Sequence, residues 1–182
     1  TEAPQPNLIE AKFSESTLKQ VLGDRWVRAK YGAIVRFSEG GYPSGHLREG
    51  RIREPGLYRI RVTGYAYQSV DPLPVYFSAI SYAPGSEKPI LGFASFPPGK
   101  PTTIEKTGWL EPNQMLVVEP YGIRDADSYT RKKTGESIHD YEGPGFAFLS
   151  ATMEGPIIEE FPSRGHKLIF GNLVRREIEP SN

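Results

Sequence analysis

Cysteine is absent from this chain of 182 residues. Without thiols the protein has no disulfide, no nucleophilic cysteine and no cysteine-ligated zinc, iron–sulfur cluster or covalently attached haem. An excess of charge is absent too, because 22 Lys and Arg balance 22 Asp and Glu. Binding to nucleic acid or to an anionic membrane surface needs a basic surplus, so we expect neither of these partners.

Long apolar runs are also missing. The longest, such as Met115–Val118 and Phe146–Leu149, have the size of strands, whereas a membrane-spanning helix needs about 20 apolar residues. We therefore expect no membrane span. The chain starts at Thr1 and no charged and then apolar leader follows, so we expect its N-terminus to be a processed or excised boundary.

Catalytic motifs are absent as well, among them G-x-S-x-G, G-x-x-x-x-G-K, G-x-G-x-x-G and H-E-x-x-H. The histidines His46, His139 and His166 lie far apart in polar contexts, and we expect surface positions for them. The predicted strands carry few inward-facing acids, mainly Glu105 and Glu119, for which we expect structural salt bridges. We therefore expect the chain not to be an enzyme. The alternative is a hydrolase with two acids facing each other across a cleft.

Glycine and proline are abundant, with 19 and 17 residues, and they fall between short β-rich runs, as turns between strands do. Seven or eight short strands without long helices between them predict an all-β fold. Its expected form is an antiparallel β-sandwich, jelly-roll-like, with a short N-terminal helix. The predicted strands are Trp26–Phe37, Leu57–Tyr67, Val75–Tyr82, Ile90–Phe96, Thr102–Leu110, Met115–Tyr121 and Gly145–Glu154.

The chain divides into three parts around this sandwich. Residues 1–25 form an N-terminal extension with a predicted helix over Glu15–Leu22, for which Ser14 is a suitable N-cap. Residues 26–156 form the sandwich domain. Residues 157–182 form a C-terminal exit segment that we expect to pack on it.

Tyrosine is the residue type that suggests a function, because the chain has ten of them. The strand Leu57–Tyr67 has a period of two, which predicts one buried and one more exposed face. Aromatic rings stack on the apolar faces of sugar rings, and arginines bind hydroxyls or carboxylates. The alternative for each tyrosine is a place at the rim of the core with its hydroxyl in water. The candidate ligand-binding residues are Tyr65, Tyr67, Arg61, Arg59 and Tyr76.

Asp125 and Asp127 supply hard oxygen ligands at alternate positions and are candidate ligands of a structural calcium ion. The alternative is a solvated, charged loop with local turns. A thermal melt with calcium and with chelator separates the two. We expect no other cofactor.

Four dispersed motifs follow one another in the chain: Gly-Leu-Tyr-Arg-Ile-Arg-Val at 56–62, Pro-Pro-Gly-Lys-Pro-Thr at 97–102, Leu-Glu-Pro at 110–112 and Glu-Gly-Pro at 154–156. In this order they resemble a segment of the large planctomycete cytochrome-c-type proteins, which are exported chains built largely from domains of unknown function. The resemblance covers about two-thirds of the chain, from Gly56 to Leu173. The final stretch departs from the family pattern at Phe161–Ser163 and Gly171–Leu173. The matching positions are Gly56, Tyr58, Arg59, Arg61, Val62, Pro97–Thr102, Leu110–Pro112 and Glu154–Pro156.

This resemblance implies an exported protein in the periplasm or at the cell surface, with a β-sandwich similar to carbohydrate-binding modules. It supplies no ligand residues, and any electron transfer belongs to the haem part of the parent protein. Together with the tyrosine–arginine face it predicts a non-catalytic carbohydrate-binding module for a polysaccharide or oligosaccharide. The alternative is a structural or protein-interaction spacer that contacts other domains of the same parent chain and binds no glycan.

Overall fold

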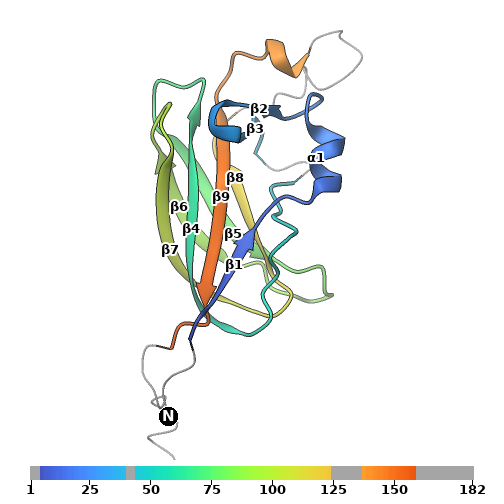
Figure 1. The fold of residues 1–182 in the computed structure, drawn as a ribbon, viewed down its shortest axis with the longest axis vertical. Coiled ribbons are helices and arrows are strands. Elements are labelled where there is room, and N and C mark those ends of the chain that lie inside the picture. The colour runs from blue at the N-terminus through green and yellow to red at the C-terminus, as the bar shows by residue number, and fades with distance from the viewer. Residues whose placement is uncertain (1–4, 40–43, 124–136, 159–182) are drawn as a thin grey trace, which may run out of the picture.

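The computed structural model describes residues 5–39, 44–123 and 137–158. Within them the chain forms two antiparallel sheets, as Figure 1 shows, and the predicted all-β sandwich is confirmed. The strands are β1 (Asn7–Ala11), β2 (Val27–Arg28), β3 (Ile34–Arg36), β4 (Gly56–Tyr67), β5 (Leu73–Ile80), β6 (Ile90–Phe96), β7 (Thr102–Leu110), β8 (Met115–Pro120) and β9 (Gly145–Gly155). The larger sheet has the order β2–β3–β9–β4–β7, with β1 also beside β9, and the smaller has the order β6–β5–β8.

The core lies between the two sheets and follows the predicted alternation. On β4, Tyr58, Ile60 and Val62 are buried, while the residues between them are half-buried. They belong to one apolar cluster with Val75 and Phe77 of β5 in the opposite sheet. Full burial of one large apolar side chain contributes about 1.5–3 kcal/mol, so this cluster is the main source of stability.

The segment before the predicted sandwich contributes a strand to it. β1 pairs with β9 from Asn7 opposite Gly155 to Ala11 opposite Ala151. The sequence alone predicts no strand here, because Asn, Glu and Ala give Asn-Leu-Ile-Glu-Ala little β-propensity of its own. β9 supplies a free edge, and tertiary pairing decides the structure. The predicted boundary at residue 26 therefore does not separate the sandwich from the N-terminal segment.

The helix was predicted almost to its ends. Helix α1 spans Glu15–Val21, and the side chain of Ser14 accepts a hydrogen bond from the backbone N–H of Thr17, 3.3 Å away. The leucine predicted as its last residue, Leu22, is the C-cap. No helix among the described residues is long and apolar enough to cross a membrane.

The predicted strand Trp26–Phe37 is interrupted in the structure. It forms β2, a 3-10 turn η1 (Lys30–Gly32) and β3, and β2 pairs with β3 as a hairpin. Tyr31 and Gly32 have left-handed φ angles of 62° and 75°, which reverse the chain. The predicted strand is therefore wrong between Lys30 and Gly32. The Tyr-Gly pair favours a turn there, because glycine adopts the left-handed conformation without a steric penalty.

A buried ion pair joins the two sheets where β3 approaches β8. Arg36 of β3 is fully buried; its Nη1 donates to the carbonyl of Val118 at 3.1 Å, and its Nη2 lies 3.4 Å from Oε1 of Glu119. The indole of Trp26 lies under the guanidinium, with 5.3 Å from Cζ to the ring centroid. The backbone N–H of Gly45 donates to the same carboxylate at 3.0 Å. These residues form the sheet junction.

The junction has no room for a side chain at residue 45. A Cβ there would collide with the guanidinium of Arg36, the carbonyl of Val118 and the side chain of Glu119. Burial lowers the pKa of Arg36 and the carboxylate of Glu119 opposes this shift. The salt bridge predicted for Glu119 is thus present, and it lies in the interior.

His46 lies beside the sheet junction, with its Nδ1 2.8 Å from the hydroxyl of Tyr82. Burial lowers the pKa of His46 from its ordinary value, and the carboxylate of Glu119 opposes the shift. The predicted surface position is therefore only partly correct, because this side of the domain encloses the ring. The cations that lower the pKa further are Arg48, Arg36 and Lys88.

Replacing Glu119 by alanine is expected to lower the free energy of unfolding by about 3–5 kcal/mol, because a buried guanidinium loses its carboxylate. The matched control is Glu105→Ala, which removes an exposed carboxylate from β7. It is expected to cost about 1 kcal/mol or less. Urea unfolding of both variants measures the difference, and equal losses would contradict the role given to the junction.

The free energy of unfolding is expected to decrease as the pH falls below the ordinary pKa of histidine, about 6.5. Since the folded-state pKa of His46 is lowered, its contribution is fully present above the unfolded-state value of about 6.5 and is lost as the pH falls through the folded-state pKa. Urea unfolding at several pH values, compared with His46→Gln, measures this slope. An NMR titration of His46 with a midpoint at or above 6.5 would refute it.

Candidate functional site

The five candidate ligand-binding residues lie in three different places. Arg59 and Arg61 form one group on the outer face of the larger sheet, Tyr65 and Tyr67 lie further along the same strand, and Tyr76 lies on the smaller sheet. From Arg61 to Tyr65 the strand advances by four residues, about 13 Å. Arg59, Arg61, Tyr65 and Tyr67 thus share the outer side of β4, as the alternation predicts, but the arginines and the tyrosines lie at separate places along it.

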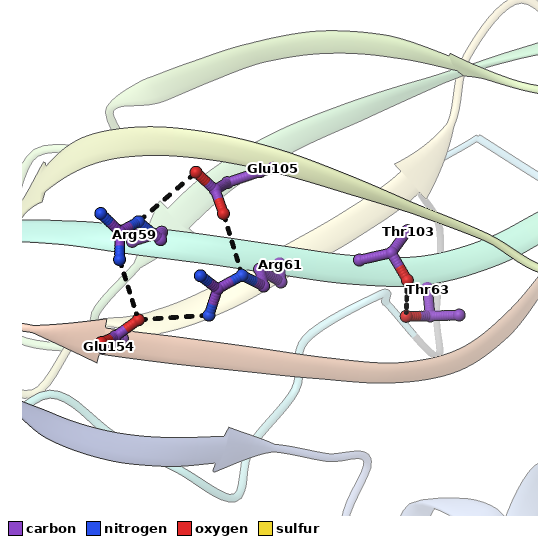
Figure 2. Close-up of polar contacts among 6 residues, drawn as sticks. All are labelled: Arg59, Arg61, Thr63, Thr103, Glu105 and Glu154. Atoms are coloured by element: carbon purple, nitrogen blue, oxygen red, sulfur yellow. Dashed lines mark hydrogen bonds and ion pairs between the residues drawn. The ribbon is translucent and has the colours of Figure 1, made fainter.

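Arg59 and Arg61 are held in a four-residue ion-pair network with Glu105 of β7 and Glu154 of β9, which Figure 2 shows. Nε of Arg61 lies 2.9 Å from Glu105 and its Nη1 lies 3.1 Å from Glu154. Nη1 of Arg59 lies 3.2 Å from Oε2 of Glu154, the atom that Nη1 of Arg61 also contacts. The arginines alternate with carboxylates across neighbouring strands, so the network stabilises the pairing of β7, β4 and β9.

This network changes two expectations. Glu105 was predicted to face inward, but its side chain is 52% exposed on the outer face, because Ile104 and Leu110 occupy the inward positions of β7. The salt bridges predicted for it are present. The two arginines have much of their donor capacity occupied by these carboxylates, so a ligand would have to displace them.

Tyr76 belongs to an aromatic patch on the outer face of the smaller sheet. It lies opposite Phe93 of β6, with ring centroids 5.9 Å apart, and Phe93 meets Tyr121 edge-on at 5.1 Å. Phe93 and Tyr121 are each 48% exposed. We call these three residues the aromatic patch.

Tyr65 is buried in a second apolar cluster on the outer face of the larger sheet. The pairing of β4 with β9 shifts register between Thr63 and Gly64, and beyond this point β3 and the 3-10 turn η2 (Ile138–Asp140) supply apolar neighbours. Only 4% of Tyr65 is exposed. The expectation of an open face at Tyr65 is therefore corrected, because segments distant in the sequence cover it. Its neighbours in the cluster are Val27, Ala33, Val35, Phe37, Ile138 and Ala147.

Tyr65 and Tyr67 nevertheless line a pocket of about 430 Å³ at this end of the sandwich. Tyr31, at the hairpin turn between β2 and β3, forms another part of its lining and is 66% exposed. The rings of Tyr31 and Tyr65 are perpendicular, with 6.2 Å between centroids. Tyr31, Tyr65 and Tyr67, with their polar neighbours Lys30, Gln68 and Ser69, are called the tyrosine pocket.

Two residues of the tyrosine pocket have strained backbone. Tyr31 has a φ angle of 62° and Gln68 one of 49°, a left-handed conformation that non-glycine residues seldom adopt. The Gln68 amide, with its nitrogen turned toward them, donates to the carbonyls of Tyr141 and Gly143 at 3.1 Å each. Such strain is typical of functional sites, where the surrounding structure maintains it.

The pocket presents hydroxyl groups and one cation. Burial raises the pKa of Tyr65, and the neighbouring Tyr67 and Tyr31 raise it further. The Tyr65 hydroxyl thus stays protonated at neutral pH and can donate a hydrogen bond. Lys30 adds a positive charge, and the lining residues that the structure describes include no Asp or Glu. The arrangement suits a polar, uncharged ligand with apolar ring faces.

Tyr31 is not among the residues predicted from the sequence, because it falls inside the predicted strand Trp26–Phe37. The signal was present in Lys-Tyr-Gly, since a glycine within an apolar run often marks a turn. Its place beside Tyr65 could not be found from the sequence, because these residues are far apart along the chain.

The predicted calcium ligands Asp125 and Asp127 lie outside the described residues, so calcium binding stays a prediction from the sequence. His166 lies outside them as well. Among the residues that the structure does describe, no group of three or more His, Asp or Glu is placed to hold a metal ion.

Comparison with known proteins adds no family to this description. No protein-family model matches the chain, and no curated protein matches its sequence.

Proposed function

We propose that this chain is a non-catalytic carbohydrate-binding module of a larger exported cytochrome-type protein, and that the tyrosine pocket is its glycan site. The observation that carries the proposal is the exposed ring of Tyr31, held by a left-handed turn above the buried ring of Tyr65. The turn reverses the chain between β2 and β3 and leaves most of the Tyr31 ring exposed beside the pocket, where a ligand with an apolar ring face can cover it.

The chemistry of the pocket fits a sugar. The exposed face of Tyr31 can stack on the C–H face of a pyranose, and the hydroxyl of Tyr65 can donate to a ring substituent. Lys30 and Ser69 add polar groups at the same pocket. A volume of about 430 Å³ lies within the range of small-ligand sites.

Binding without hydrolysis is favoured over catalysis. Glycoside hydrolysis needs a pair of carboxyl groups on either side of the scissile bond, and within the described part of the chain the lining of the tyrosine pocket contributes none. Glu105 and Glu154, the nearest facing acids on β4's neighbouring strands, are both engaged by arginines.

The aromatic patch favours the alternative function, a spacer or interaction domain that contacts another domain of the same parent chain. Exposed aromatic residues gathered on one face are typical of protein contact surfaces. The patch and the tyrosine pocket lie on different sheets, so the two functions predict different sensitive residues.

Tyr31→Asn is expected to weaken glycan binding at least tenfold, which corresponds to about 1.4 kcal/mol. Asparagine tolerates the left-handed backbone, so the turn is kept while the ring is lost. A glycan array identifies the ligand, and isothermal titration calorimetry measures the affinities of the wild type and the variant.

The matched control is Tyr82→Asn, which removes a tyrosine that is 57% exposed beyond the far end of β5. It is expected to retain wild-type affinity. Absence of binding to neutral and acidic glycans alike would refute the proposal. Equal effects of the two substitutions would place the site elsewhere.

A further inference from the structure

A second pocket, of about 820 Å³, lies at the opposite end of β4 from the tyrosine pocket. Tyr58, near the start of β4, belongs to its lining, whereas Tyr67 at the end of that strand belongs to the tyrosine pocket. Arg51 and Arg53 provide its positive charges, and Asn7 and Asn113 provide amide groups. These four polar residues, with Tyr58, are called the arginine pocket.

Backbone hydrogen bonds place the two arginines. Ile52 is buried; its N–H donates to the carbonyl of Gln114 and its carbonyl accepts from the N–H of Asn113, each at 2.9 Å. This anchor leaves the residues on either side of it, Arg51 and Arg53, exposed at the pocket. The position of the charges is therefore set by the fold.

These arginines differ from the pair on β4. Arg59 and Arg61 each contact two carboxylates. Within the described part of the chain, by contrast, no ion pair joins Arg51 or Arg53 to an acidic side chain. Glu54 is the one acid among the described residues that line the pocket, and its backbone carbonyl accepts a hydrogen bond from the Tyr58 hydroxyl at 2.8 Å.

Two guanidinium groups that contact no carboxylate of residues 5–39, 44–123 and 137–158 attract anions of matching geometry. A guanidinium binds a carboxylate or a sulfate through two parallel N–H donors, and these charge-assisted bonds are about twice as strong as neutral ones. The amides of Asn7 and Asn113 can donate to hydroxyl or carbonyl oxygens next to the anion. The lining is thus complementary to an acidic sugar.

We propose that the arginine pocket is a second binding site, specific for the carboxylate or sulfate groups of an acidic polysaccharide. The identity of the ligand as a glycan rests on the proposed function, whereas the anion specificity rests on the arginine pocket alone. The two pockets lie at opposite ends of one strand, so a long glycan chain can engage them separately or together.

The test measures the binding of the whole chain to polygalacturonate, to a sulfated galactan and to a neutral glucan by calorimetry, at low salt and at 0.3 M salt. The double variant Arg51→Gln/Arg53→Gln is expected to lose at least tenfold in affinity for an acidic polymer and to keep the wild-type affinity for the neutral one. Arg51→Lys/Arg53→Lys keeps the charge without the paired donors and is expected to give an intermediate loss. The wild-type affinity is expected to fall with salt.

The matched control is Lys19→Gln/Lys88→Gln, which changes the net charge equally at exposed positions away from the pocket. Equal losses in the two double variants would overturn the proposal, because the effect would then be one of net charge. Equal wild-type affinity for acidic and neutral polymers would also overturn it.

The proposed function can fail separately. This is the result if Tyr31→Asn leaves the affinity for neutral glycans unchanged while the arginine variants still lose affinity for the acidic polymers. If the sulfated polymer alone responds, or polygalacturonate alone, the site is assigned to that anion.

Discussion

The buried contact between Arg36 and Glu119 is the constraint on which the arrangement of this domain depends. It links β3 of the larger sheet to β8 of the smaller one, and Gly45 and Trp26 complete its surroundings. Removal of a charge from water is costly, so this contact tolerates little displacement. β3 also forms one arm of the hairpin that carries Tyr31. The junction therefore positions the aromatic wall of the tyrosine pocket as well as the two sheets.

Arginine has three different roles in this small domain. Arg36 is fully enclosed and joins the sheets. Arg59 and Arg61 are half-exposed and satisfied by carboxylates on both neighbouring strands, as the cross-strand pairing requires. Arg51 is exposed at a pocket whose described lining holds a single acid. The side chain is the same in each case, and the partners that the fold provides differ.

Much of the fold could be predicted from local patterns. β6 and β7 were predicted to the residue, and the alternation of β4 identified its core side correctly, because the period of two reflects burial on one face. β1 could not be predicted, since its strand conformation depends on pairing with residues about 140 positions away. The burial of Tyr65 has the same cause, because its cover comes from β3 and η2.

The candidate site could be predicted less well than the fold. Tyr65 and Tyr67 do lie at a pocket, but its most exposed ring, Tyr31, depends on a turn within an apparently continuous strand. Arg59 and Arg61 looked available because the sequence does not show which carboxylates face them. The carboxylates that lie opposite an arginine are set by the register between strands, and one sequence does not reveal the register between distant strands.

The edge of β9 that faces away from β4 is covered by two short strands in succession. β3 pairs with its first part, at residues 146–148, and β1 with its last part, at residues 151–155. Unpaired strand edges recruit strands from other molecules. A version of the chain that began after Ala11 would expose the backbone of β9 over that last part, and self-association through this edge would follow. The smallest well-behaved form of the domain therefore includes Asn7–Ala11, although these residues contribute few side chains to the core.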